Sequence, residues 1–198
     1  MLHVPPLETQ RLMIRPCRMD DLDALHQILD LDLGTEGAKT HYEREKWLQW
    51  TVLSYEELAK LNQPPYGDRA IVLKQKQQVI GVCGFVPCLA PFGQLPAYSS
   101  VSTDRFNVPE YGLFYALSSA YQRQGYATEA VQALIDYAFT QLRLKRIVAT
   151  TTYENVASMG VMRKVGMCIE ENPYSDPPWF QVVGILENQP AYSQQTGS

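Results

Sequence analysis

The stretch from Tyr111 to Ala130 constrains the fold of this 198-residue chain more than any other. It begins with an apolar and aromatic run of strand length, Tyr111 to Leu117, and continues through polar residues to Gly125. After Gly125, apolar residues recur at intervals of three and four, as on one face of a helix. A loop that leads into a helix start presents free backbone N–H groups and the positive end of the helix dipole. The stretch therefore predicts a strand, a loop and a helix that together suit a phosphate or pyrophosphate group.

A β-branched run from Lys145 to Thr152 predicts the next strand. Residues 118–145, which separate it from the first strand, are enough for a crossover through one helix, so the two strands are expected to be parallel neighbours. Asn155 then offers a good N-cap for a short helix that ends near Gly166.

The rest of the chain predicts an antiparallel sheet with helices. Strands are expected at 7–16, 69–74, 78–87, 167–172 and 179–186, and helices from residue 20 and over 40–61, the latter as one helix or two. Residues 89–109, which contain several prolines, are expected to be irregular. The sum is an α+β fold in a single domain over 1–198, with its core at about 7–187 and flexible ends at 1–6 and 190–198.

Composition and charge exclude several classes of function. The net charge of −4 and the pI of about 5.4 argue against a nucleic-acid-binding surface. The cysteines form no C-x-x-C pair, so neither a metal site nor a disulfide framework is expected; they are Cys17, Cys83, Cys88 and Cys168. The amino terminus has no secretory pattern and no apolar run reaches the length of a membrane span, so we expect a cytoplasmic protein without membrane contact.

In this context the chain resembles the GNAT superfamily of acyl-CoA-dependent N-acyltransferases, and most closely its RimJ/RimL-type branch. The family's pyrophosphate loop has the form Q/R-x-x-G-x-G/A, which Gln122, Gly125 and Ala127 match. Further matches to the branch are Leu7-x-Thr9-x-Arg11-Leu12-x-x-Arg15-Pro16, Asn155-x-x-Ser158 and Lys164-x-Gly166-Met167. The resemblance implies the GNAT fold, a mostly antiparallel twisted sheet of about seven strands with one splayed parallel pair and helices on both faces.

The resemblance also implies acetyl-CoA as co-substrate and no metal. The pantetheine arm would lie in a V-shaped gap between the two parallel strands, and the pyrophosphate would lie on the N–H groups of the loop. The cofactor-binding residues would be Phe114, Tyr115, Ala116, Leu117, Gln122, Arg123, Gln124, Gly125, Tyr126, Ala127, Thr128, Asn155 and Ser158. Arg123 is either a charged contact or a solvent-facing side chain, and Asn155 is a helix N-cap that can also contact pantetheine.

Two residues are candidates for catalysis. Glu110, where family members often carry a carboxylate, would take the proton from the amine, directly or through a water; the alternative is a solvated glutamate at the end of a strand. Many members have a tyrosine at the position of Met162, so Ser158 would assist the departing sulfur instead, or else position the cofactor or pack against the helix. Tyr153 and Tyr115 are reserve phenols.

The activity implied is transfer of an acetyl group from acetyl-CoA to a primary amine by direct attack on the thioester. A protein N-terminal amine is the first acceptor considered, and a small-molecule amine or polyamine is the second. Trp47, Trp50 and residues 89–109 would line the acceptor side. The resemblance to the RimJ/RimL branch also implies a possible homodimer. The competing interpretation is an acyl-CoA-binding module without catalysis.

Overall fold

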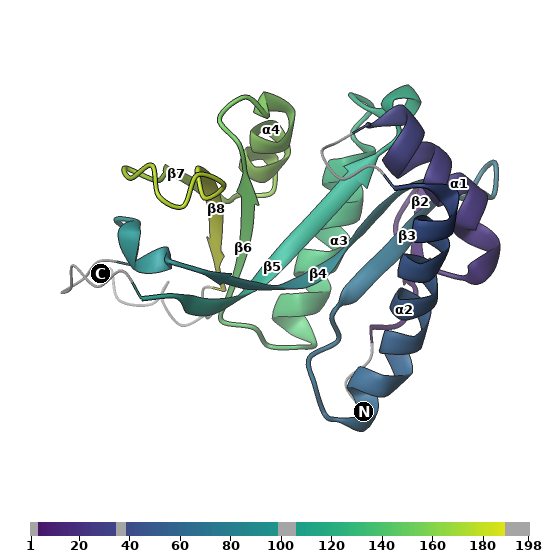
Figure 1. The fold of residues 1–198 in the computed structure, drawn as a ribbon, viewed down its shortest axis with the longest axis horizontal. Coiled ribbons are helices and arrows are strands. Elements are labelled where there is room, and N and C mark those ends of the chain that lie inside the picture. The colour runs from purple at the N-terminus through teal and green to yellow at the C-terminus, as the bar shows by residue number, and fades with distance from the viewer. Residues whose placement is uncertain (1–3, 35–38, 99–105, 189–198) are drawn as a thin grey trace, which may run out of the picture. The chain divides into compact units, whose positions relative to one another are not determined.

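The computed structural model describes residues 4–34, 39–98 and 106–188. In this part of the chain, eight strands form one sheet in the order β1-β2-β3-β4-β5-β6-β8-β7 (Figure 1). The strands are β1 (Leu7–Glu8), β2 (Leu12–Pro16), β3 (Gly67–Leu73), β4 (Gln78–Ala90), β5 (Val108–Leu117), β6 (Arg146–Thr151), β7 (Cys168–Glu171) and β8 (Val182–Glu187). The α-helices are α1 (Leu22–His26), α2 (His41–Lys60), α3 (Tyr126–Thr140) and α4 (Val156–Lys164). Short helical segments are η1 (Met19–Asp21), η2 (Gln27–Asp32), η3 (Phe92–Gln94) and η4 (Ser119–Tyr121).

The predicted α+β class with a mostly antiparallel sheet is confirmed. Strands β5 and β6 run parallel, with Gly112 opposite Val148, whereas β6 pairs antiparallel with β8. The sheet has one strand more than the seven expected, because a turn divides the strand predicted at 7–16. In that turn the Leu12 N–H donates to Thr9 Oγ1 at 2.9 Å, which separates β1 from β2.

Contacts within the chain group it into two compact units. The first unit comprises Met1–Val86 and Leu113–Leu134, and the second comprises Pro87–Gly112 and Ile135–Ser198. Strands β4 and β5 each contribute residues to both units. The single domain over 1–198 stays a prediction.

In the first unit, α2 packs against β3 (Figure 1). The stretch predicted at 40–61 is a single helix, and a capping box at Thr40 and Glu43 satisfies its first N–H groups. Its inner face joins a core cluster of buried residues, which are Cys17, Leu25, Leu48, Ala70, Val72 and Val82. The buried Arg44 forms an ion pair of 2.6 Å with Asp30 of η2, which ties α2 to the segment before it.

The second unit has its own core. Strands β6 and β8 contribute Val148, Val183 and Ile185 to it. The prediction of an irregular stretch over 89–109 is wrong at its start. β4 continues to Ala90, and Phe92 and Leu95 are fully buried against this core. Apolar burial therefore orders a segment whose proline content predicted a loop; residues 99–105 lie outside the described part.

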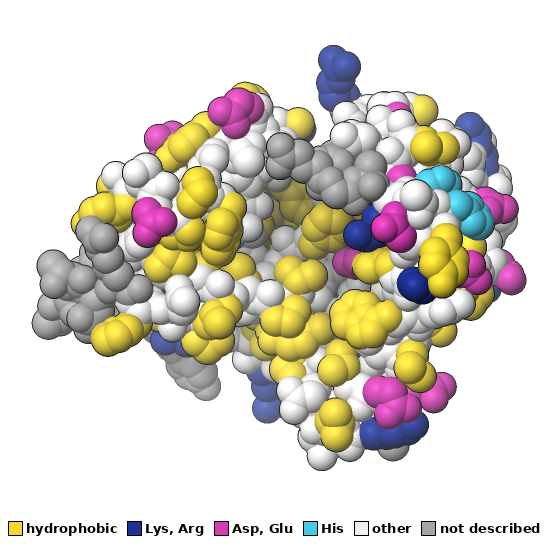
Figure 2. Space-filling model, viewed as in Figure 1, with side chains coloured by type: hydrophobic (Ala, Val, Ile, Leu, Met, Phe, Trp, Pro, Cys, Tyr) yellow, Lys and Arg dark blue, Asp and Glu magenta, His cyan; other side chains and the backbone are white. Residues whose placement is uncertain are grey.

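The two tryptophans of α2 have different surroundings. Trp47 is partly buried against the core of the first unit, and the Arg44 guanidinium lies 4.7 Å from its ring centroid. Trp50 is 64% exposed, and Tyr42 and Leu53 are also exposed. Figure 2 shows hydrophobic side chains gathered over α2. Trp47 therefore packs against this core with part of its surface, and Trp50 is the more exposed of the two; that they line the acceptor side stays a prediction.

Replacing Gly81 by alanine is expected to lower the free energy of unfolding by about 3 kcal/mol, at the upper end for overpacking. A Cβ at this position in β4 would overlap the carbonyl oxygen of Ala116 and lie 3.0 Å from the Cα of Leu117. Both obstacles are backbone atoms of β5, which cannot move aside without separating the strands. Urea unfolding measures the loss.

The matched control is Gly160→Ala, because a Cβ on Gly160 in α4 meets no atom within 4 Å. Alanine in a helix is favoured over glycine by roughly 0.5–1 kcal/mol, so this variant is expected to be as stable as the native protein or more so. Equal stability of the two variants would contradict a close approach of β4 and β5 at Gly81.

Candidate functional site

The predicted phosphate loop follows β5 and leads into α3. Two of its residues adopt positive φ, 59° at Arg123 and 83° at Gly125, directly before the helix begins at Tyr126. Glycine adopts this conformation without strain, whereas arginine does so at a cost of about 1 kcal/mol. The residues from Gln122 to Gly125 are exposed, so the backbone of this turn is open to solvent.

Side-chain amides of the loop donate to backbone carbonyls of the loop and of the last residue of β5. Gln122 Nε2 donates to the carbonyl of Leu117 at 3.0 Å, and Gln124 Nε2 donates to the carbonyl of Ala120 at 3.0 Å. A free carbonyl oxygen would repel an anion. These two carbonyl oxygens are already hydrogen-bonded to side-chain amides of the loop. The first N–H groups of α3 have no acceptor within the helix, as at every helix start. The loop thus has the backbone chemistry of an anion site.

The predicted pantetheine strand is the last part of β5. Phe114 is 38% exposed, Tyr115 and Ala116 are half-buried, and Leu117 is buried. The Ser118 N–H donates to the carbonyl of Ile80 at 3.0 Å, which joins this end of β5 to β4.

Asn155 and Ser158 lie together in the second unit. Asn155 Oδ1 accepts from the backbone N–H of Ser158 at 3.0 Å, so the predicted N-cap of α4 is confirmed. Met162, which stands where many family members have a tyrosine, is buried and would contact any side chain added at Gly184. Met162 is therefore a core residue. The phenol of Tyr153, a reserve candidate for catalysis, donates to the carbonyl of Asn172 at 3.2 Å.

Glu110 lies inside β5 rather than at the end of a strand, since β5 begins at Val108. Its side chain is only 10% exposed, and Oε1 lies 3.2 Å from Nε of Arg146 in β6. This contact is an ion pair by distance, although Arg146 Nε makes no hydrogen bond among the described residues. Arg146 also pairs with Glu187 at 3.0 Å and lies over the ring of Tyr98, 4.2 Å from its centroid. Burial, followed by the nearby Glu110 carboxylate, raises the pKa of the Tyr98 phenol well above its usual range.

The predicted site residues are divided between the two compact units. The first unit holds the end of β5 and the loop, and the second holds Glu110, Asn155 and Ser158. The V-shaped gap and the roles of these residues stay predictions.

Sequence reasoning missed the groups that hold the loop. Glu129, in the first turn of α3, accepts hydrogen bonds from Thr9 and Arg11, and Asp32 of η2 accepts from Ser119. Thr9 and Arg11 belong to a motif that resembled the branch, but nothing in the motif itself pointed to Glu129. The partners lie far apart in the sequence, so spacing carried no signal.

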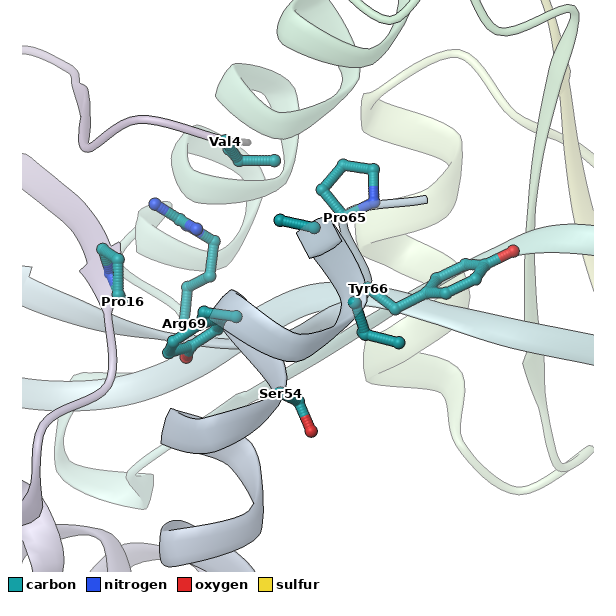
Figure 3. A pocket seen from close by; sticks show the side chains of 9 residues that line it. Val4, Pro16, Ser54, Pro65, Tyr66 and Arg69 are labelled. Atoms are coloured by element: carbon teal, nitrogen blue, oxygen red, sulfur yellow. The ribbon is translucent and has the colours of Figure 1, made fainter. Parts of the chain in front are cut away.

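The first unit also contains a small cavity of about 70 Å³ (Figure 3). It is lined by Val4, Pro16, Ser54, Tyr55, Leu58, Ala59, Pro65, Tyr66 and Arg69, none of which is a predicted site residue. The Arg69 side chain extends from β3 toward Val4, and its Nη2 donates to the carbonyl of Pro5 at 2.8 Å. The cavity therefore lies beside the hydrogen bond by which Arg69 holds the amino-terminal segment.

Asp68, the neighbour of Arg69 in β3, carries a titratable carboxyl. Its Oδ1 is shielded from solvent and has no hydrogen-bond partner among the described residues, although the residue as a whole is half-buried. Burial raises the pKa of this carboxyl to about 6, against the opposing charge of Arg44. Since the pKa is higher in the folded state than the usual 3.8, the folded protein binds this proton more tightly, and stability falls as pH rises from about 4 to 6.

Asp68→Asn is therefore expected to raise the free energy of unfolding at pH 7.5 by on the order of 2–3 kcal/mol. It should also remove the part of the pH dependence that falls between about pH 4 and 6. Urea unfolding at several pH values measures both effects, with the exposed Asp20→Asn as control. A variant no more stable than the native protein at pH 7.5 would show that Asp68 is compensated in the folded state.

Comparison with known proteins identifies the class to which this chain belongs. A family model described as an acetyltransferase (GNAT) domain matches residues 11–168. The chain therefore belongs to the GNAT acetyltransferase family.

One relative is also named as an N-acetyltransferase. The chain is 42% identical over 62 residues to YnaD of Bacillus subtilis (strain 168), which is named as an uncharacterized N-acetyltransferase. That match covers 31% of this chain and 36% of YnaD, so it spans about a third of the relative's length.

Two solved structures share the fold. The acetyltransferase from Agrobacterium tumefaciens strain C58 superposes with a TM-score of 0.68 at 24% identity, covering 94% of this chain and 96% of that one. RimL, a ribosomal L7/L12 alpha-N-protein acetyltransferase in complex with coenzyme A, gives a TM-score of 0.61 at 18% identity, with 89% and 93% coverage.

No helix in the described ranges is long and apolar enough to cross a membrane.

Proposed function

We propose that this protein transfers an acetyl group from acetyl-CoA to a primary amine. The observation that carries the proposal is the exposed turn with positive φ at Arg123 and Gly125, directly before the start of α3. Such a turn aims N–H groups and a helix dipole at a phosphate. Membership of the acetyltransferase family and the coenzyme A named for RimL support acetyl-CoA as the ligand.

In this proposal the pyrophosphate lies on the N–H groups from Gln124 to Thr128, beside Gln122 and Arg123. The pantetheine arm runs along the backbone of residues 114–117 and contacts Asn155. The exposed backbone at Gly125 supports this placement, because no Cβ there obstructs a phosphate.

The reaction is attack of a neutral amine on the thioester carbon. The C–N bond forms, the C–S bond of the tetrahedral intermediate breaks, the amine loses a proton, and the thiolate gains one. Glu110, directly or through a water, takes the proton from the amine, and Ser158 donates a hydrogen bond to the departing sulfur. The near-burial of Glu110 is compatible with a base that is screened from bulk water.

The first acceptor considered is a protein N-terminal amine, as in the RimJ/RimL branch. An α-amine has a pKa near 7.7–8.0, so an appreciable part is neutral at pH 7, whereas a lysine amine near 10.4 needs more help from a base. The second acceptor class is a small-molecule amine or polyamine. The exposed Trp50 offers an apolar contact to either.

Thiol release from acetyl-CoA tests the proposal, with a panel of N-terminal peptides, amino acids and polyamines as acceptors. We expect thiol release that depends on at least one acceptor class. Tight binding of CoA without acceptor-dependent thiol release would instead identify a binding module without catalysis. Absence of CoA binding would overturn the cofactor assignment itself.

A further inference from the structure

The loop between β5 and α3 is held at its end by a carboxylate of α3 and by the turn between β1 and β2. Glu129 Oε1 accepts from Thr9 Oγ1 at 2.6 Å and from the Arg11 N–H at 2.9 Å, while Oε2 accepts from Arg11 Nε at 2.6 Å. The Glu129 side chain is 18% exposed. Burial alone would raise the pKa of this carboxyl, but the hydrogen bonds from Thr9 and Arg11 outweigh it and hold the pKa below its usual value. Glu129 is therefore an ionised carboxylate with three donors.

Arg11 transmits this anchoring to the loop itself. Its Nη1 donates to the carbonyl of Gln124 at 3.0 Å, and its guanidinium lies over the Tyr126 ring, 4.2 Å from the centroid. A Cβ built on Gly125 would lie 3.3 Å from Nη2. Arg11 thus borders three consecutive positions of the turn. The direction of its guanidinium is set by Glu129.

A second carboxylate holds the start of the loop. Asp32, the last residue of η2, accepts from the backbone N–H of Ser119 at 2.7 Å and from the hydroxyl groups of Ser119 and Ser118 at 2.5 and 2.8 Å. Hydrogen bonds from Ser119 and then Ser118 lower the pKa of Asp32. Both ends of the loop are therefore fixed by residues more than eighty positions away in the sequence.

The loop needs such support because its backbone is strained. Arg123 has a φ of 59°, which a non-glycine residue adopts only when its surroundings enforce it. A flexible loop would also have to be ordered by the ligand, which weakens binding.

We propose that Asp32 and the Thr9–Arg11–Glu129 cluster are positioning groups that preorganise this loop for the pyrophosphate. The proposal rests on the function proposed above and assigns these groups no contact with the ligand. It makes the turn between β1 and β2 a support of the cofactor site, although that turn lies at the opposite end of the unit's sequence.

Electrostatics makes the proposal sharply testable. A carboxylate near the pyrophosphate repels it, so removal of the Glu129 charge would tighten binding if charge alone mattered. Removal of the anchor would weaken binding, because the amide nitrogen of a glutamine cannot accept. In one orientation of the amide the bond from Arg11 Nε is lost, and in the other the bond from the Arg11 N–H is lost. The sign of the change in affinity therefore separates the two roles.

The experiment compares the native protein with Glu129→Gln in calorimetric titration with coenzyme A. We expect the dissociation constant to rise about tenfold. Pantetheine, which lacks the pyrophosphate, serves as second probe in an NMR titration and should bind both proteins equally. The control is Glu56→Gln, an exposed carboxylate on α2, which should leave both affinities unchanged.

Unchanged or tighter binding of coenzyme A by Glu129→Gln would overturn the proposal. An equal loss of affinity for coenzyme A and for pantetheine would also overturn it, because the effect would then not be specific to the pyrophosphate. If Glu129→Gln does not fold, Asp32→Asn provides the same comparison with the same criteria. Native protein that binds no coenzyme A would overturn the proposed function, whereas native binding with unaffected variants would overturn the positioning role alone.

Discussion

Gly125→Asp is expected to reduce the affinity for coenzyme A by more than about 100-fold. Two unit charges 4 Å apart interact by about 4 kcal/mol at an effective dielectric constant of 20, so a carboxylate beside the pyrophosphate is strongly unfavourable. Arg11 would not cancel the new charge, because its guanidinium already pairs with Glu129 at 2.6 Å. The group formed by Arg11, Glu129 and the new aspartate would carry one net negative charge. Aspartate would also have to adopt the positive φ of 83° that Gly125 has here.

Gly125→Asn is the matched control for this prediction. Asparagine has the size of aspartate and tolerates positive φ, but it is neutral. We expect it to weaken binding by about tenfold or less, so that the difference between the two variants reports the charge. Calorimetric titration measures both dissociation constants. Affinity of the aspartate variant within threefold of the native value would show that the pyrophosphate binds elsewhere.

Glu110→Gln is expected to lower kcat/KM by about 10²- to 10⁴-fold, the usual contribution of a general base. Glutamine keeps the shape of the side chain but cannot accept the proton from the amine. Coenzyme A affinity should not change, since Glu110 acts on the acceptor. Steady-state thiol release, together with calorimetric titration, measures both quantities.

A structural role for Glu110 predicts a different result. Its ion pair with Arg146 in a nearly buried position could stabilise the second unit without any part in catalysis. In that case Glu110→Gln would lower the melting temperature while the folded enzyme kept its kcat/KM. The control is Glu187→Gln, which removes the other carboxylate partner of Arg146 but, at 46% exposure, should affect neither catalysis nor stability strongly. A folded Glu110→Gln variant with native kcat/KM would rule out the base.

Several features of the fold were predictable because they depend on neighbouring residues. The apolar spacing after Gly125 predicted α3, which runs from Tyr126 to Thr140. Asn155 predicted the start of α4, because an asparagine side chain caps the N–H three residues ahead. The order of these elements also carried the resemblance to the family that the comparison with known proteins confirmed.

The parallel pairing of β5 and β6 was predicted correctly, but several other features that depend on distant residues were predicted wrongly or not at all. The prolines after Pro87 suggested a loop, but Phe92 and Leu95 are buried in a core that β6 and β8 complete. Trp47 and Trp50 lie on the same helix, α2, and the pattern of apolar residues in its sequence does not distinguish them. Only Trp47 packs against the core of the first unit. Burial against a partner element decides such cases, and the partner is not visible in a short stretch of sequence.

The sequence by itself determined the class of fold and the loop at the start of α3, because backbone propensity, capping and helical periodicity are local properties. Only the tertiary structure decided which charged groups surround that loop. Glu129 meets Arg11 and Asp32 meets Ser119 across more than eighty positions of sequence, and Glu110 meets Arg146 across the parallel pair of strands. Hydrogen bonds and ion pairs between such residues form only where folding brings their elements together.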